Sequence, residues 1–359
     1  MQKTETLIVG QGLCGTWLSW WMRRNNHHFI VIDEGKTISS SRIASGVINP
    51  VTGRVLAPTW MVDTLIPFAL EAYTSIGNEL GISVIQQTRI LHSFPTQQMR
   101  EAFEKKLPKL PDYLHEVNDF NYWDQYMQSP YGLGGIAPAL LIDLNLLLNS
   151  WQKVLKQSNR LLEESFNAND LELTDTYIRY KDITAERIIF CDGIHGMSLP
   201  WFNRLPFSPN KGEALLLEIK GLPADHIYKK GISLVPYPHV GEKQNASYFW
   251  AGSTYENRFE HDQPTEAFRQ RTEDQVRNWL KLPFKTLHHW AAIRPATVER
   301  RPFVGMHPHI PRIGLLNGMG TKGCSLAPYF GKQLTEHIIN GSNITPEASL
   351  RRFSSLLRP

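Results

Sequence analysis

Three glycines near the N-terminus, followed by an acidic pair, form the pattern with the clearest chemistry in this sequence. Gly10, Gly12 and Gly15 stand in the order Gly-x-Gly-x-x-Gly directly after an apolar segment. The first glycine permits a tight turn, the second lets a diphosphate approach the backbone, and the third lets a helix pack closely on a strand. Asp33 and Glu34 follow at about the 20-residue distance of a carboxylate that binds a ribose hydroxyl. The pattern indicates a dinucleotide site and does not separate NAD from FAD.

The segments around these glycines predict a strand–turn–helix–strand unit. Residues 6–9 and 29–32 are short, apolar and rich in β-branched side chains, as buried parallel strands are. Residues 16–24 carry apolar side chains at helical spacing and end in two arginines, which suit a helix C-terminus. The free N–H groups and the dipole at the start of such a helix favour a bound diphosphate. The alternative is a glycine turn in another kind of α/β protein.

Composition bounds the class of protein. The chain has 359 residues, of which 42% are hydrophobic and 20% charged, and this balance excludes a disordered chain. Three cysteines without a Cys-x-x-Cys pair argue against a disulfide scaffold and a zinc ribbon. No apolar run reaches the roughly 20 residues of a membrane span, and no secretion signal is evident, so we expect a cytoplasmic protein. The net charge of +4 is weak evidence for nucleic-acid binding.

The rest of the chain alternates helical and strand patterns. Apolar spacing predicts helices over 60–80, 143–157 (with Asp143 as N-cap), 264–280 and 331–339. Strand patterns cover 84–94, 161–166, 171–173, 177–180 and 187–191. Residues 95–135 are aromatic and show no clean period. Residues 211–260 predict an antiparallel sheet broken by turns at Lys211-Gly212 and at Pro236-Tyr237-Pro238.

Four segments outside the N-terminal unit carry a resemblance to a known family. They are the Ser/Arg-rich loop 39–50, the strand end Cys191-Asp192-Gly193, the stretch 292–305 (AIRPATVERRPFVG) and the stretch 318–328 (GMGTKGCSLAP). In this order, across nearly the whole chain, they resemble the fingerprints of the FAD-dependent D-amino acid oxidase family. That family includes glycine oxidase, sarcosine oxidase and glycerol-3-phosphate dehydrogenase. Two positions depart from it, because Glu299 stands in place of the usual Asp and Thr321 in place of the second arginine of glycine oxidase.

The resemblance implies an α/β protein with two interleaved domains. A Rossmann-type FAD-binding domain would be combined with an α+β substrate domain built on a mostly antiparallel sheet. The expected boundaries are 1–80, 135–205 and 296–359 for the FAD-binding domain, and 81–134 and 206–295 for the substrate domain.

The cofactor implied by the resemblance is FAD. We expect it to be bound non-covalently, because residues 256–317 contain no cysteine that could attach it. The residues expected to contact FAD lie within the fingerprints: Gly10, Gly12, Leu13, Cys14, Gly15, Asp33, Glu34, Arg42, Ser45, Gly46, Val47, Cys191, Asp192, Gly193, Gly318, Gly320, Thr321, Lys322 and Gly323. The three cysteines, Cys14, Cys191 and Cys324, are interpreted as small packing residues beside it. No metal site is expected, because the neighbouring histidines of His27-His28 and His288-His289 would point to opposite faces of a strand.

Three residues are candidates for catalysis. Arg294 stands at the family position of the arginine that holds a substrate carboxylate, and its planar fork suits both carboxylate oxygens. Lys322, at the start of the last helix, is expected to stabilise negative charge at the N1/O2 edge of reduced flavin. Tyr255 follows a strand that resembles the family's Gly-Gly-Thr-x-Glu and is expected at the mouth of the pocket. A surface salt bridge, a solvated lysine and a core or rim tyrosine are the respective alternatives.

These residues predict an FAD-dependent oxidoreductase that oxidises the C–N bond of a small amine or amino acid. Hydride would pass from the α-carbon to flavin N5, the imine would be hydrolysed, and O2 or another acceptor would reoxidise the flavin. One alternative is an oxidase that modifies the wobble uridine of tRNA, which the basic end around Arg351-Arg352 permits. Another is a redox-inactive flavoprotein subunit. The substrate, the electron acceptor and the oligomeric state are left open.

Overall fold

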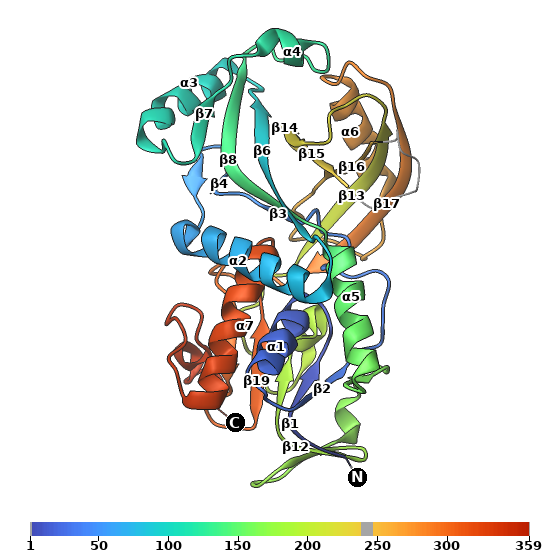
Figure 1. The fold of residues 1–359 in the computed structure, drawn as a ribbon, viewed down its shortest axis with the longest axis vertical. Coiled ribbons are helices and arrows are strands. Elements are labelled where there is room, and N and C mark those ends of the chain that lie inside the picture. Colours follow the sequence, from blue (N-terminus) through green and yellow to red (C-terminus); the bar gives the residue numbers. More distant parts are fainter. Residues whose placement is uncertain (1, 238–246, 359) are drawn as a thin grey trace.

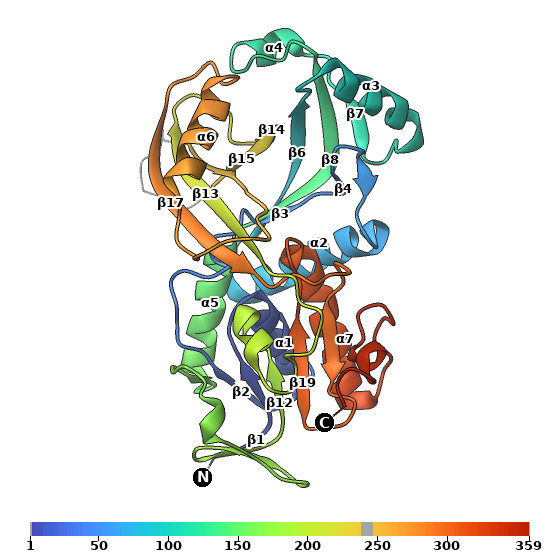
Figure 2. The same cartoon turned by 180° about the vertical axis from the view of Figure 1, so that it is seen from behind.

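Two large sheets, one above the other along the long axis of the molecule, organise the chain (Figure 1). The computed structural model describes residues 2–237 and 247–358. Helices cover the lower sheet closely, and the upper sheet carries its helices at its outer end and on one side (Figure 1). Both chain ends lie at the lower sheet (Figures 1 and 2).

The lower sheet contains the predicted strand–helix–strand unit. Its eight described strands are β10 (Leu171–Leu173), β11 (Ile178–Tyr180), β12 (Ile183–Phe190), β1 (Gln2–Val9), β2 (Phe29–Ile32), β9 (Leu161–Leu162), β18 (Phe303–Met306) and β19 (Ile313–Asn317). Strand β1 pairs in parallel with β2 on one side and β12 on the other. Ile8 packs into the core on the helical face, and its neighbours Leu7 and Val9 pack into the core on the opposite face. A continuous apolar run is therefore buried on both sides.

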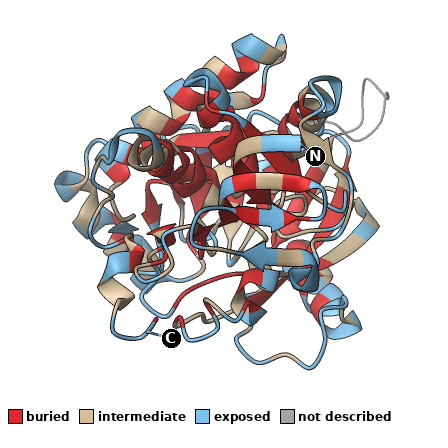
Figure 3. Ribbon diagram, turned by 90° about the horizontal axis from the view of Figure 1, so that it is seen from below, coloured by how far each residue is buried: buried red, intermediate tan, exposed pale blue. Residues whose placement is uncertain are grey.

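Four helices lie around this sheet and carry its largest core. They are α1 (Leu13–Arg24), α2 (Val62–Leu80), α5 (Leu144–Gln157) and α7 (Gly323–Asn340). Trp17 of α1 meets Tyr73 of α2 edge to face, with 4.8 Å between the ring centroids. The predicted N-cap of α5 is confirmed, because the carboxylate of Asp143 accepts a hydrogen bond from the N–H of Leu146 at 2.9 Å. Figure 3 shows buried residues concentrated in the interior of the molecule and exposed residues at its rim.

The upper sheet is mostly antiparallel. Its nine described strands are β17 (Phe284–Arg294), β13 (Asn210–Ile219), β16 (Tyr248–Gly252), β15 (Ile232–Pro236), β14 (His226–Lys230), β6 (Ile85–Ser93), β8 (Leu133–Ile142), β3 (Val47–Ile48) and β7 (Leu114–Glu116). Only the β14–β6 pair among these is parallel. The helices of this half are α3 (Gln97–Lys106), α4 (Phe120–Asp124) and α6 (Glu266–Arg277), and β4 (Val51–Thr52) pairs with β5 (Ala57–Pro58) beside the sheet. Segment 95–135, which had no clean period, therefore holds two helices and two strands.

One turn predicted from the sequence is wrong. Lys211-Gly212 lies inside strand β13, fully paired with β17 on one side. The glycine is there because the guanidinium of Arg294 lies across it, and a Cβ atom at position 212 would overlap that group. In the second predicted turn Pro236 ends β15, and Pro238 lies outside the described residues.

The predicted fold class, an α/β nucleotide-binding unit combined with a mostly antiparallel sheet, is confirmed. The central strands β9, β2, β1, β12 and β19 of the lower sheet are parallel, and β10, β11 and β18 add antiparallel pairs. The domain boundaries stay a prediction. Strand β17 is the edge strand of the upper sheet, and its carboxyl end descends to the level at which the two sheets meet (Figure 2). Among the described residues, no helix is long and apolar enough to cross a membrane.

Candidate active site

The glycine turn between β1 and α1 has a geometry that side chains do not permit. Gly10 has a φ of +96°, and a Cβ atom there would press on the carbonyl oxygen of Cys191 at 2.7 Å. At Gly15 a Cβ atom would overlap the carbonyl oxygen of Gly10. Helix α1 begins at Leu13, and its N-cap Gly12 has no side chain that could block the approach of a ligand. The N-terminus of α1 is therefore available to a diphosphate.

A cavity of about 640 Å³ opens at this turn. It is lined by the ends of β1, β2 and β12, the loop 38–42 and residues 289–293 of β17. The predicted cofactor residues in its wall are Gly10, Gly12, Asp33, Glu34, Arg42, Cys191, Asp192 and Gly193. Cavities of this volume hold cofactors and drug-sized ligands. The structure thus brings together residues from three separate fingerprints around one space.

Asp33 is held in position at the end of β2. Its carboxylate accepts hydrogen bonds from the backbone N–H of Gln11 at 2.6 Å and of Gly35 at 2.8 Å. Across the turn, the hydroxyl of Ser41 accepts a hydrogen bond from the N–H of Leu13 at 3.1 Å. The predicted acid therefore sits beside the glycine turn at the cavity wall, as the ribose contact requires.

Asp192 carries an unsatisfied polar atom into this wall. Its Oδ1 is buried and has no hydrogen-bond partner among the described residues. Burial raises the pKa of Asp192 to about 7. A protonated carboxyl is a hydrogen-bond donor, so this group fits a phosphate or hydroxyl acceptor in the cavity. The glycine N-cap of α1, the glycine cradle and this carboxyl agree with a bound dinucleotide.

The remaining predicted cofactor residues are not among the residues that line the two cavities. They are Leu13, Cys14, Gly15, Ser45, Gly46, Val47, Gly318, Gly320, Thr321, Lys322 and Gly323. The C-terminal glycine loop nevertheless packs on the segment that follows Arg294, because the N–H of Gly320 donates to the carbonyl of Pro295 at 3.1 Å. The start of α7 also meets the start of α1, since a Cβ atom at Gly323 would lie 3.3 Å from the side chain of Leu13.

All three cysteines are free thiols. Burial raises the pKa of Cys14 and of Cys324 to about 12, and it raises the pKa of Cys191 well above the ordinary thiol value. Such thiols stay protonated and unreactive at neutral pH. This supports their interpretation as packing residues.

Arg294, the last residue of β17, is fixed by hydrogen bonds from its guanidinium. Nη1 donates to Oδ1 of Asn210 at 2.8 Å and to the carbonyl of Thr254 at 3.1 Å. Nη2 donates to the hydroxyl of Ser253 at 2.8 Å. Within the described residues, these bonds leave the Nε–H and one Nη2–H for a further acceptor. The group has no carboxylate partner there, so the surface salt-bridge reading does not describe it.

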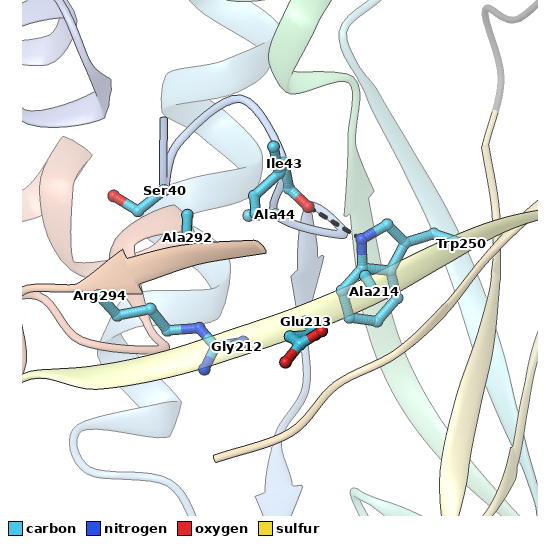
Figure 4. A pocket seen from close by; sticks show the side chains of 9 residues that line it. All are labelled: Ser40, Ile43, Ala44, Gly212, Glu213, Ala214, Trp250, Ala292 and Arg294. Atoms are coloured by element: carbon cyan, nitrogen blue, oxygen red, sulfur yellow. Dashed lines mark hydrogen bonds between the residues drawn. The ribbon is translucent and has the colours of Figure 1, made fainter. Parts of the chain in front are cut away.

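A second, small pocket of about 20 Å³ lies beside this guanidinium (Figure 4). Its walls are Ser40, Ile43, Ala44, Gly212, Glu213, Ala214, Trp250, Ala292 and Arg294. Ser40 and Ala292 also line the large cavity, so the two spaces adjoin. Arg294 therefore points its charge to a place next to the predicted cofactor.

Lys322 and Tyr255 lie outside these walls. Lys322 is the N-cap of α7, and its ammonium makes no hydrogen bond or salt bridge within the described residues. Burial lowers its pKa, and the nearby charges of Arg301 and Arg300 lower it further. Tyr255 is 49% exposed. It lies close to Arg294, whose pKa is lowered by burial, and its interaction with the guanidinium opposes that lowering. Tyr255 is thus at the rim, and the roles of both residues stay predictions.

Sequence reasoning missed a buried charged cluster on the opposite face of β13. Glu213 is fully buried and accepts hydrogen bonds from the N–H of Thr265 at 2.7 Å and from Nε2 of His289 at 2.9 Å. The ammonium of Lys211 lies 3.2 Å from the same carboxylate. Burial disfavours the charge, but the bonds from Thr265 and the ammonium outweigh it, so the pKa of Glu213 is lowered. The sequence Lys211-Gly212-Glu213 places two opposite charges on the same face of a strand and could have indicated this cluster. It was missed because the segment was predicted to be a turn.

The parallel sheet, the glycine turn and the adjoining cavity define a dinucleotide-binding α/β protein of Rossmann type. A sequence profile described as "FAD dependent oxidoreductase" (DAO) matches residues 5–337. The chain therefore belongs to the DAO family of FAD-dependent oxidoreductases.

Individual relatives are distant in sequence and close in fold. Glycine oxidase from Bacillus subtilis (strain 168) is 21% identical over 94% of this chain and 93% of its own length. Among solved structures, iminodiacetate oxidase from Chelativorans sp. BNC1 has a TM-score of 0.75 at 17% identity, covering 98% of each chain. Glycine oxidase from Geobacillus kaustophilus has a TM-score of 0.76 at 14% identity, covering 97% of this chain and 98% of its own. At such identity the structures establish a shared fold.

Proposed function

We propose that this enzyme oxidises the C–N bond of a small amine that carries a carboxylate, such as an amino acid or an N-substituted glycine. Arg294 would hold the carboxylate, and FAD would bind without a covalent link in the 640 Å³ cavity. When bound, FAD supplies the two-electron acceptor for amine oxidation. Glycine oxidase and iminodiacetate oxidase, to which the chain is similar, are named for substrates of this kind.

The guanidinium of Arg294 is the observation that carries the proposal. It is already oriented by Asn210, Ser253 and Thr254, so little side-chain freedom is lost when a carboxylate binds. Its remaining N–H groups can donate charge-assisted hydrogen bonds to carboxylate oxygens. Because the pocket adjoins the large cavity through Ser40 and Ala292, a carboxylate held here would place the neighbouring C–N bond beside the cofactor.

Lys322 would act from the other side of this region. It lies at the N-terminus of α7, where its ammonium and the helix dipole add their positive potentials. With Arg300 and Arg301 nearby, this potential favours an anionic substrate and the negative charge that accumulates on reduction. The amine of the substrate, once oxidised, would leave as an imine that water hydrolyses.

The test is reductive titration of the FAD-loaded enzyme without oxygen. We expect glycine, sarcosine, iminodiacetate or a small D-amino acid to bleach the visible absorbance of the oxidised flavin. Arg294→Met should raise the substrate concentration needed for half-bleaching about 100-fold, because charged hydrogen bonds contribute about 1.5–3 kcal/mol. It should leave the FAD dissociation constant within about twofold of the wild type.

Arg271→Met is the matched control, since Arg271 is an exposed residue of α6 away from both cavities. It should change neither quantity. A chain that fails to bind FAD after refolding with the cofactor, or a flavin that none of these amines reduces, would contradict the proposal. Equal loss of FAD and substrate binding in Arg294→Met would reject the role given to the arginine.

A further inference from the structure

Trp250 lies over a floor of small residues in the pocket beside Arg294 (Figure 4). On this face of the upper sheet, Gly212, Ala214, Gly252 and Ala292 are small, and the large residue Trp290 pairs with Ala214 beside them. The indole closes one end of this floor, because a Cβ atom at Gly252 would lie 3.1 Å from its ring. The tryptophan is 6% exposed and is not part of the charged cluster on the opposite face of β13.

The indole is held by a hydrogen bond between the two halves of the molecule. Its Nε1–H donates to the carbonyl of Ile43 at 2.9 Å (Figure 4). Ile43 belongs to the loop that follows the nucleotide-binding strand β2, whereas Trp250 belongs to strand β16 of the upper sheet. A buried tryptophan with its only polar atom satisfied is a rigid wall. It therefore bounds the pocket at a fixed distance from the cofactor loop.

The remaining volume decides what this wall excludes. The pocket of about 20 Å³ has room for about one water molecule. A bulky group next to the carboxylate would have to displace the indole, and displacing it would break its bond to Ile43. Pocket walls of this kind discriminate between substrates by size.

We propose that Trp250 determines substrate size by excluding any large substituent next to the carboxylate that Arg294 holds. This inference rests on the proposed function, because it takes the carboxylate position from there. Only the carboxylate end of a substrate enters the space between the guanidinium and the indole, and its α-carbon lies toward the adjoining large cavity. A branched or aromatic substituent turned toward the indole has no room there. Within the described residues, the indole hydrogen-bonds to Ile43 and not to Asn210, Ser253, Thr254 or Glu213, so its effect is on size and not on charge.

The experiment uses the FAD-loaded enzyme and two carboxylates of different size. Acetate and benzoate are titrated separately, and binding is followed by the shift in flavin absorbance. For each protein we take the ratio of acetate affinity to benzoate affinity. We expect this ratio to be at least about tenfold higher in the wild type than in Trp250→Leu. In Trp250→Leu, benzoate affinity should rise at least about tenfold while acetate affinity stays within about threefold. Trp250→Phe keeps most of the bulk but loses the bond to Ile43. Its acetate-to-benzoate affinity ratio should lie between those of the wild type and Trp250→Leu.

Phe249→Leu is the matched control. Phe249 is the neighbouring residue on β16, faces the core on the other side of the sheet and is fully buried. Loss of an aromatic ring there should leave the acetate-to-benzoate ratio unchanged. If Trp250→Leu does not fold, Trp250→Phe alone must still shift the ratio toward benzoate.

The outcomes separate this inference from the function on which it rests. Acetate binding that Arg294→Met abolishes, with a ratio unchanged in both Trp250 variants, overturns the assignment of Trp250 and leaves the proposed function standing. A flavin that responds to neither carboxylate in any variant overturns both. A wild type that binds benzoate as tightly as acetate overturns the size limit.

Discussion

The glycine turn at Gly10–Gly15 and the pocket at Arg294 are built in opposite ways. The turn is made by one short segment, in which each glycine stands where a Cβ atom would strike backbone or side-chain atoms close by. The pocket is assembled from β13, β16, β17 and the loop 40–44, which are far apart in the sequence. Its arginine is oriented by three residues on two of the other segments.

This difference teaches where each site tolerates change. At Gly10 and Gly15 the turn is limited by the backbone carbonyls of Cys191 and Gly10, which cannot move without shifting the strand ends. The pocket is limited by the ends of side chains, which can move at small cost to the fold. Substitutions in the turn should therefore affect stability and cofactor binding together, and substitutions in the pocket should affect substrate binding alone.

Gly15→Ala is the most severe test of that comparison. Because the new methyl group would overlap the carbonyl oxygen of Gly10, we expect a loss of about 3 kcal/mol in the free energy of unfolding. FAD binding should weaken with it. Urea unfolding and fluorescence titration with FAD measure the two effects.

Gly81→Ala is the control for this variant. Gly81 has a φ of +68° and open space around its Cα, so only left-handed strain of about 1 kcal/mol is expected. Equal destabilisation by the two substitutions would show that steric overlap at the turn does not set its tolerance.

Gly212→Ala places the same methyl group in the pocket. Here the overlapping atoms are the guanidinium of Arg294, the end of a flexible side chain. We expect the arginine to move, acetate binding to weaken about tenfold, and FAD binding and the unfolding midpoint to change little. Flavin absorbance during an acetate titration reports the first effect. Gly221→Ala, in an open turn after β13, is the control, and a large loss of stability in Gly212→Ala would erase the contrast.

Substitution of Asp192 should have the smallest effect, and this effect should be a pH dependence of FAD binding. Its pKa of about 7 means that the neutral form predominates below pH 7 and the anion above it. Since the anion would repel a diphosphate, we expect the FAD dissociation constant to rise by up to about tenfold from pH 6 to pH 8. Asp192→Asn should remove this rise, and Asp175→Asn, at an exposed loop position, should retain it.

Asp192 should also make the free energy of unfolding of the cofactor-free protein depend on pH. The folded pKa lies above the ordinary Asp value of 3.8, so the folded state binds the extra proton between these limits. Stability should therefore fall as pH rises from about 4 to about 7 and level off above that. In Asp192→Asn the free energy of unfolding should lose this decrease with pH. If it falls with pH equally in the wild type and in Asp192→Asn, the burial of the carboxyl is contradicted.

Much of the fold was predictable because its signals are local. The strand–helix–strand unit, the N-cap Asp143 and helix α6 after its N-cap Thr265 all depend on residues a few positions apart. Segment 95–135 was not readable, because its short helices and strands are stabilised by packing against the upper sheet. Gly212 was misread as a turn, because a glycine inside a strand has no local explanation when its reason is a distant guanidinium.

By itself, the sequence determined the dinucleotide turn, its acidic partner, the identity of Arg294 as a candidate and the family that these residues indicate. Those features depend on residue types at short spacing, which the chain order preserves. Only the tertiary structure decided that Arg294 is oriented by Asn210, Ser253 and Thr254, that Glu213 is buried with Lys211 and His289, and that Trp250 closes the pocket. These contacts join strands whose neighbours in the sheet are distant in the chain, so no spacing in the sequence records them.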